Sequence, residues 1–118
     1  MIIIEEKELF NAIAKHIVIS EINDKWDEAV LKIMVIGDSV DFNLNFKYAN
    51  GTIQNSKLKN AFFCSLDVIK LHKLTNDHPN YKKWNKAEFT LYSNSKSKIE
   101  YIWDQKLQDE IDLLNQSS

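Results

Sequence analysis

The segment Trp84–Tyr101 constrains the fold of this chain more than any other, because two alternating patterns flank one short polar turn. Alternation of apolar and polar side chains is typical of an antiparallel strand with one buried face. A five-residue turn at Ser93–Ser97 fixes the register of the whole hairpin. The predicted pairs are Ala87–Trp103, Phe89–Tyr101 and Leu91–Ile99 on the apolar face, and Glu88–Ile102, Thr90–Glu100 and Tyr92–Lys98 on the polar face. The sequence therefore predicts a half-buried hairpin in this register.

The same segment carries a recognisable motif. It consists of a Trp, an apolar residue followed by Thr-Leu, a turn that contains Ser, and the run Lys-x-Lys-Ile-acidic-Tyr. The matching residues are Trp84, Phe89, Thr90, Leu91, Ser93, Lys96, Lys98, Ile99, Glu100 and Tyr101. In this motif the chain resembles the YezG-like immunity proteins. The resemblance covers 18 of the 118 residues, and beyond Tyr101 the chain departs from the family pattern.

Members of that family bind polymorphic secreted toxins, often nucleases, and silence them inside the producing cell. The resemblance therefore implies a cytoplasmic immunity protein, an antitoxin whose partner is a cognate toxin domain delivered by secretion or by contact. A nuclease is the expected class of toxin. Such an inhibitor needs only a complementary surface. We therefore expect no catalytic residue, cofactor or metal site, and no direct contact with nucleic acid or membrane.

Composition and length limit the classes of protein to which this chain can belong. A chain of 118 residues with 44% hydrophobic content predicts one folded domain, 1–118. No run of 18 apolar residues occurs, so no membrane span is expected, and the charged run after the first four residues does not fit a signal peptide. The single cysteine, Cys64, fits a reducing compartment. All 15 basic residues are lysine, which disfavours sequence-specific recognition of DNA bases by arginine. Only two glycines occur, which disfavours nucleotide binding by a glycine-rich phosphate loop.

Periodicity predicts an α+β fold with the order α-β-β-β-α-β-β-α, in which helices pack on one face of an antiparallel sheet. A first helix has an apolar stripe of Leu9, Ile13 and Ile17, with acids in its first turn, where the helix dipole favours them. Three strands follow, and the cleanest alternation runs from Val40 to Tyr48. The first is expected to begin at Trp26 or Ala29 and to end at Ile36, and the other two to span 40–48 and 52–57.

The third of these strands is predicted to be a polar edge strand, and it follows Asn50-Gly51, a sequence typical of hairpin turns. A second helix at 61–76 is expected to bury one face. Its residues are Phe62, Leu66 and Ile69, widened by Phe63, Leu71 and Leu74. The hairpin comes next, and a third helix is predicted at 106–115.

None of the reactive side chains has the spacing of a recognised catalytic or metal site. Cys64 and His72 are separated by two turns of one predicted helix, roughly 12 Å along its axis, so they cannot form a nucleophile–base pair. His16 lies on the first helix and His78 follows the second, and no compact zinc spacing occurs. We interpret Cys64 as a core residue and the histidines as boundary or solvated residues. An enzyme of unrecognised type is a third hypothesis.

Charge is distributed unevenly: residues 1–50 carry a net −4, 51–99 a net +6, and 100–118 a net −4. A nuclease presents basic residues to phosphate, so acids in loops at the sheet ends would suit it as a partner. The candidate partner-binding residues are Asp24, Asp27, Glu28, Asp38 and Asp41. The alternative is a lysine-rich nucleic-acid-binding or regulatory module. Its candidate residues are Lys57, Lys59, Lys82, Lys83 and Lys86, with Tyr81 and Trp84 beside them for stacking.

Overall fold

The computed structural model describes residues 4–20 and 25–116, and in these ranges it shows three helices and a five-stranded antiparallel sheet. The element order is α-β-β-β-α-β-β-α, so the predicted α+β fold is confirmed. The elements are α1 (Ile4–Val18), β1 (Trp26–Ile36), β2 (Ser39–Tyr48), β3 (Ile53–Ser56), α2 (Ala61–Asn76), β4 (Lys86–Tyr92), β5 (Ser97–Ile102) and α3 (Gln105–Gln116). Within the described ranges no helix is long and apolar enough to cross a lipid bilayer.

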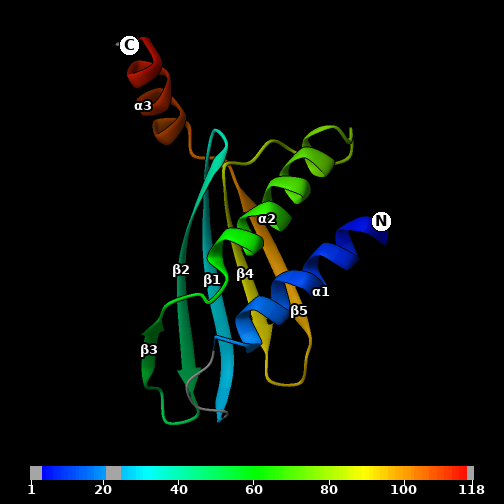
Figure 1. The fold of residues 1–118 in the computed structure, drawn as a ribbon, viewed down its shortest axis with the longest axis vertical. Coiled ribbons are helices and arrows are strands. Elements are labelled where there is room, and N and C mark those ends of the chain that lie inside the picture. Colours follow the sequence, from blue (N-terminus) through cyan, green and yellow to red (C-terminus); the bar gives the residue numbers. More distant parts are fainter. Residues whose placement is uncertain (1–3, 21–24, 117–118) are drawn as a thin grey trace.

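The strands lie in the order β3-β2-β1-β4-β5, with each neighbouring pair antiparallel (Figure 1). β1 is central, as its nearly continuous apolar sequence predicts, and β3 is an edge strand. Helices α1 and α2 lie side by side over one face of the sheet. The core lies between this helical layer and the sheet, where Ile13, Leu31, Phe46 and Phe89 are fully buried. α3 lies beyond the end of the sheet (Figure 1).

The predicted register of the β4–β5 hairpin is wrong by two residues. The observed pairs are Ala87–Tyr101, Glu88–Glu100, Phe89–Ile99, Thr90–Lys98 and Leu91–Ser97. The loop has three residues, Ser93–Ser95, because the Tyr92 N–H donates to the Lys96 carbonyl at 2.8 Å and extends the ladder. Ser95 is in the left-handed region (φ 72°), as the third residue of such loops usually is. A shift of two residues preserves the side-chain alternation, so each residue still faces the predicted side.

Burial in the hairpin follows the distance from the middle of the sheet. Phe89 and Leu91 on β4 are buried, whereas Ile99 and Tyr101 are only partly buried because β5 is an edge strand. Trp103 lies outside β5 and is exposed, so its predicted place opposite Ala87 is wrong.

The buried stripe of α2 is predicted only in part, since Cys64 and Leu71 are buried as expected. Cys64, Val68, Leu71 and Thr75 face the core, at the spacing i, i+4, i+7 and i+11. The residues expected inside, Phe62, Phe63 and Leu66, lie on the outside instead. Ile69 is partly buried at the boundary. α2 therefore has two apolar stripes, and the fold buries the one with the smaller side chains.

One residue of the acidic first turn is not solvated as expected. Glu6 is only 3% exposed, and its two carboxylate oxygens accept hydrogen bonds from the Tyr81 hydroxyl at 3.0 Å and the Tyr101 hydroxyl at 2.8 Å. Tyr101 stacks on the buried Trp84 with 4.9 Å between ring centroids. This network fastens the start of α1 to β5 and to the loop before β4. Burial, reinforced by the hydrogen bond to Glu6, raises the pKa of Tyr101 well above its usual value.

Candidate partner-binding surface

The structure does not bring the predicted acidic residues together. Asp27 and Glu28 lie at the start of β1, whereas Asp38 is in the β1–β2 turn and Asp41 is near the start of β2. An extended strand of this length separates the two pairs by about 30 Å. Asp24 lies outside the described residues. The set is therefore two separate pairs at opposite ends of the sheet, not one patch.

The sheet face that α1 and α2 leave uncovered has a balanced charge. Strand alternation and register place four lysines and four acids on it. They are Lys32, Lys47, Lys86 and Lys98, with Glu28, Asp41, Glu88 and Glu100. Opposite charges interspersed in this way give little net attraction for a charged partner. Charge complementarity therefore does not select this face as the binding surface.

A polar clamp holds the base of α3 against the start of β4. The Asp104 carboxylate accepts a hydrogen bond from the Leu107 N–H at 3.0 Å, as an N-cap does, and one from Lys86 Nζ at 2.7 Å. The side chain of Asn85 accepts from the Asp104 N–H and donates to the Asp104 carbonyl. These contacts, chiefly the one with Lys86, hold the pKa of Asp104 below its usual value. The first turn of α3 therefore has a fixed position.

Beyond this clamp, α3 packs little against the rest of the chain. None of its described residues is fully buried, although Leu107, Ile111 and Leu114 form one apolar stripe. A groove of about 590 Å³ separates α3 from the end of α2 and the β1–β2 turn. The residues that α3 contributes to this groove are Gln105, Gln108, Ile111, Asp112 and Asn115. The side of α3 that faces its own fold is thus mostly polar, and Leu114 is 72% exposed.

Aromatic and acidic side chains complete this end of the molecule. Trp103 precedes α3, donates from its indole Nε1 to Gln105 and lies under the ammonium of Lys83 at 5.4 Å. We define the α3 surface as Trp103, the apolar stripe Leu107, Ile111 and Leu114, and the acids Asp109, Glu110 and Asp112. Gly37 lines the groove opposite α3, so the adjacent Asp38 lies at the same end. One of the five predicted acids, Asp38, therefore lies near the α3 surface.

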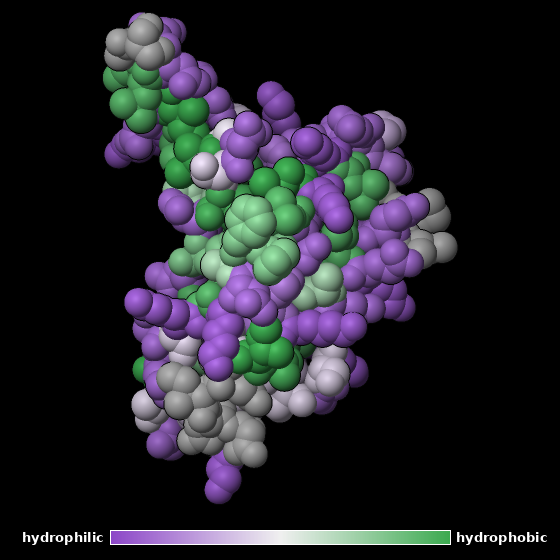
Figure 2. Space-filling model, viewed as in Figure 1, coloured by the Kyte–Doolittle hydropathy of each residue, from purple (hydrophilic) through white to green (hydrophobic). Residues whose placement is uncertain are grey.

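The outer face of α2 has the opposite charge. Phe62 is 68% and Phe63 59% exposed, Leu66 is also exposed, and the two phenyl rings contact each other edge to face. Figure 2 shows apolar side chains gathered in the middle of the helical face, with hydrophilic ones around them. We define the α2 outer face as these three residues and the exposed lysines Lys57, Lys59, Lys70 and Lys73. Nothing in the sequence pattern distinguishes this stripe from a buried one.

The lysines of the nucleic-acid alternative do not form one surface. Lys57 and Lys59 precede α2, whereas Lys82, Lys83 and Lys86 follow it, and a helix of its length separates the two groups by about 24 Å. Trp84, expected in the core as the simpler interpretation, is fully buried and cannot stack on a base. Lys86 is held by Asp104. The structure thus offers no continuous basic and aromatic track at these positions.

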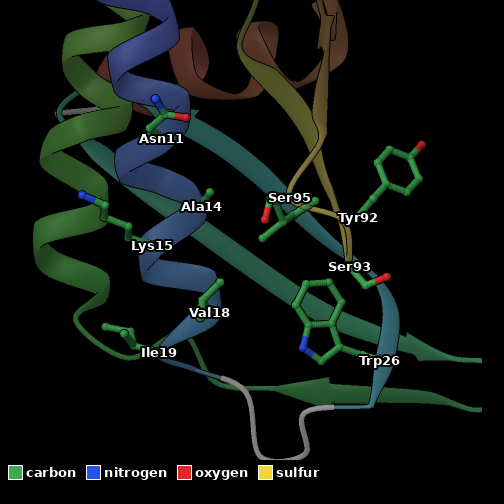
Figure 3. Close-up of a pocket in the computed structure, with 10 residues that line it drawn as sticks. Asn11, Ala14, Lys15, Val18, Ile19, Trp26, Tyr92, Ser93 and Ser95 are labelled. Atoms are coloured by element: carbon green, nitrogen blue, oxygen red, sulfur yellow. The ribbon is translucent and has the colours of Figure 1, made fainter.

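A groove of about 750 Å³ lies between α1 and the β4–β5 turn (Figure 3). In Figure 3, Ala14 and Val18 of α1 face Trp26 and the hairpin turn across it. The described residues that line it include Lys15, Ser93 and Ser95, but no carboxylate, imidazole or thiol. These residues therefore supply no acid–base pair for catalysis.

The reactive side chains are engaged in structural contacts. His16 pairs with Asp67 at 3.0 Å and links α1 to α2, and His72 hydrogen-bonds the Trp84 carbonyl at 2.9 Å. Cys64 is fully buried, and burial raises the pKa of its thiol to about 12. Since the thiolate is the reactive form, Cys64 in this state is a poor nucleophile. In the described ranges no three His, Cys, Asp or Glu side chains are grouped closely enough to hold a metal ion.

Comparison with known proteins adds no relative. No model of a known protein family matches the chain, and no curated protein sequence matches it significantly.

Proposed function

We propose that the chain is a cytoplasmic immunity protein that binds and neutralises a cognate toxin domain, with a nuclease as the expected class, and that the α3 surface enters the toxin. Two observations support the proposal. The first is the resemblance of Trp84–Tyr101 to the YezG-like immunity proteins. The second, which carries the argument about mechanism, is α3 itself: an amphipathic helix with its base fixed and its apolar stripe only partly buried, with Leu114 exposed.

A helix of 12 residues is marginal in water without tertiary packing, and α3 has little of it. Recognition of an amphipathic helix by a hydrophobic groove would supply the missing packing. Full burial of a Leu or Ile side chain contributes about 1.5–3 kcal/mol, so Leu107, Ile111 and Leu114 are the expected source of affinity. Trp103 at the base of α3 is a large side chain of the kind that dominates interface energetics.

Charge accounts for the class of partner. α3 carries Asp109, Glu110 and Asp112 against Lys106, a net −2. Asp38 is adjacent to Gly37, which lines the groove opposite α3. A nuclease must hold phosphates with basic residues, so its active-site surface attracts an acidic helix. Exposed charges of this kind chiefly raise the association rate, whereas the apolar anchors slow dissociation. An inhibitor that uses both would bind quickly and remain bound.

The test is binding to the toxin domain encoded next to this chain. Leu114→Glu places a charge on the exposed part of the α3 stripe, and Ile53→Glu is the matched control, because Ile53 is 64% exposed on the edge strand β3. We expect Leu114→Glu to weaken binding at least about tenfold and Ile53→Glu to leave it within about twofold, a difference of about 1 kcal/mol or more. Equal effects of the two variants, or no binding by the unmodified chain, would contradict the proposal.

A second pair of variants tests the acids at the two ends of the sheet. Asp38→Lys with Asp41→Lys should slow association at low salt, and the difference should shrink at high salt because exposed charges are screened. Asp27→Lys with Glu28→Lys should have a smaller effect, since these residues lie at the other end of β1. The opposite ranking would place the toxin at the β4–β5 turn.

A further inference from the structure

The α2 outer face and the α3 surface are complementary in charge. The first has four exposed lysines around Phe62, Phe63 and Leu66. Its nearest acid, Asp67, is already engaged by His16. The second carries three acids on the same helix as an apolar stripe: Glu110 borders the stripe, and Asp109 and Asp112 lie farther round the helix. In a single copy of the chain the apolar residues of the α2 outer face are exposed, and the α3 surface exposes Trp103 and Leu114. Exposed clusters of large apolar side chains mark interaction sites.

The α2 outer face is long enough to accommodate the apolar stripe of α3. Leu107 and Leu114 are seven residues apart, so the apolar stripe of α3 is about 10 Å long. On α2, the outward positions from Phe62 to Lys73 extend over about 16 Å, with the apolar side chains first and lysines after them. An acidic amphipathic helix laid along α2 would meet both the aromatic pair and the lysines.

Within one copy α3 cannot make this contact. Its base is clamped by Asn85 and Asp104, and across the groove it faces His72 and Asn76 in the second half of α2. Phe62 lies ten residues earlier, about 15 Å along the helix. α3 leads away from the sheet and from α2 (Figure 1). The helix that covers Phe62 must therefore come from another molecule.

We propose that the free protein forms a symmetrical dimer in which α3 of each copy covers the α2 outer face of the other. Contact between two α2 outer faces is disfavoured because it opposes lysine to lysine. A reciprocal exchange of α3 closes the assembly at two copies, whereas a one-way contact of the same surfaces would continue into a filament. If the proposed function also holds, toxin and dimer compete for α3, so toxin binding separates the two copies.

The experiment is sedimentation velocity of the full chain without any toxin, up to about 200 µM and at about 0.05 and 0.5 M salt. We expect a species of twice the 13.8 kDa monomer mass that weakens as salt rises. Phe63→Glu and Leu114→Glu should each weaken dimerisation by at least about tenfold, and Ile53→Glu should not. A monomer under all conditions, a filament, or equal sensitivity to Ile53→Glu would overturn the proposal.

Charge reversal makes the test specific for reciprocal exchange. One variant carries Lys70→Glu and Lys73→Glu, and the other carries Asp109→Lys and Glu110→Lys. Each variant alone opposes like charges in both contacts and should be monomeric. A mixture restores one native and one inverted contact and should dimerise again. Absence of rescue, with both variants folded by circular dichroism, would overturn the proposal. Since no toxin is present, failure here leaves the toxin-binding assay as a separate question.

Discussion

Tyr101→Phe removes one hydroxyl from the network around Glu6 and leaves the packing of the ring on Trp84 in place. The hydroxyl donates to a charged, buried carboxylate, and a hydrogen bond to a charged group contributes about 1.5–3 kcal/mol. The variant leaves Glu6 with the Tyr81 hydroxyl as a donor. We therefore expect a loss of about 2 kcal/mol in the free energy of unfolding at pH 7, or about 8 °C in Tm for a domain of this size.

The same substitution should change how stability depends on alkaline pH. Because the pKa of Tyr101 is raised in the folded protein, the folded state keeps a proton that the unfolded state loses above about pH 10. The contribution of the hydroxyl is therefore complete below pH 10 and falls by about 1.4 kcal/mol per pH unit above it. The difference between the unmodified chain and Tyr101→Phe should shrink from about 2 kcal/mol at pH 8 to less than 1 kcal/mol at pH 11.

Urea unfolding at several pH values between 8 and about 11 measures both quantities. Tyr48→Phe is the matched control, because the Tyr48 hydroxyl donates at 3.2 Å to a neutral partner, Gln54. Its expected cost is about 0.5–1.5 kcal/mol, the usual range for a neutral hydrogen bond. A cost for Tyr101→Phe no larger than that of the control, or a gap independent of pH, would refute the assignment of Glu6 and Tyr101 as a buried charged network.

Three further predictions concern the core, the thiol and the base of α3. Phe89→Ala should lower the free energy of unfolding by about 3–5 kcal/mol in urea denaturation, because Phe89 is fully buried and contacts Phe10. Cys64 should resist alkylation by iodoacetamide at pH 8 until the protein is unfolded, since its thiol is buried and has a pKa of about 12. The Asp104 clamp should be complete above the unfolded-state pKa of about 3.9 and be lost as the pH falls through the lower folded-state value. The NMR amide chemical shifts of α3 should change as the clamp is lost, and Asp104→Asn should abolish this pH dependence.

Elements with unbroken periodicity are predictable from the sequence almost to the residue. The alternation from Val40 to Tyr48 corresponds to β2, which begins at Ser39. The apolar run that ends at Ile36 corresponds to β1, which begins at Trp26, the earlier of its two predicted starts, Trp26 and Ala29. The hairpin register depends instead on whether the loop has five residues or three. The shorter loop needs Ser95 at positive φ, a position where glycine or asparagine would have been the recognisable signal.

Long-range contacts explain the other differences. Glu6 is 75 residues from Tyr81 and 95 from Tyr101 along the chain, so no local pattern distinguishes it from its solvated neighbours Glu5 and Glu8. The acidic set was expected at sheet ends, but the length of β1 determines that its two pairs are far apart. The candidate surface on α3 was missed because its apolar stripe has the periodicity of a helix that packs on the sheet.

The difference between the predicted and the observed buried stripe of α2 bears directly on function. A surface helix needs one apolar stripe to pack on a core, and α2 uses Cys64, Val68, Leu71 and Thr75 for this purpose. A second stripe that contains two phenylalanines adds nothing to the packing of the monomer and exposes large apolar side chains to water. α3 shows the complementary situation, since it has an apolar stripe and no core to bury it. The fold of one copy fully buries neither stripe, whereas assembly with another molecule can bury both. The opposite charges of the two surfaces indicate that each is suited to the other or to a partner with the same properties.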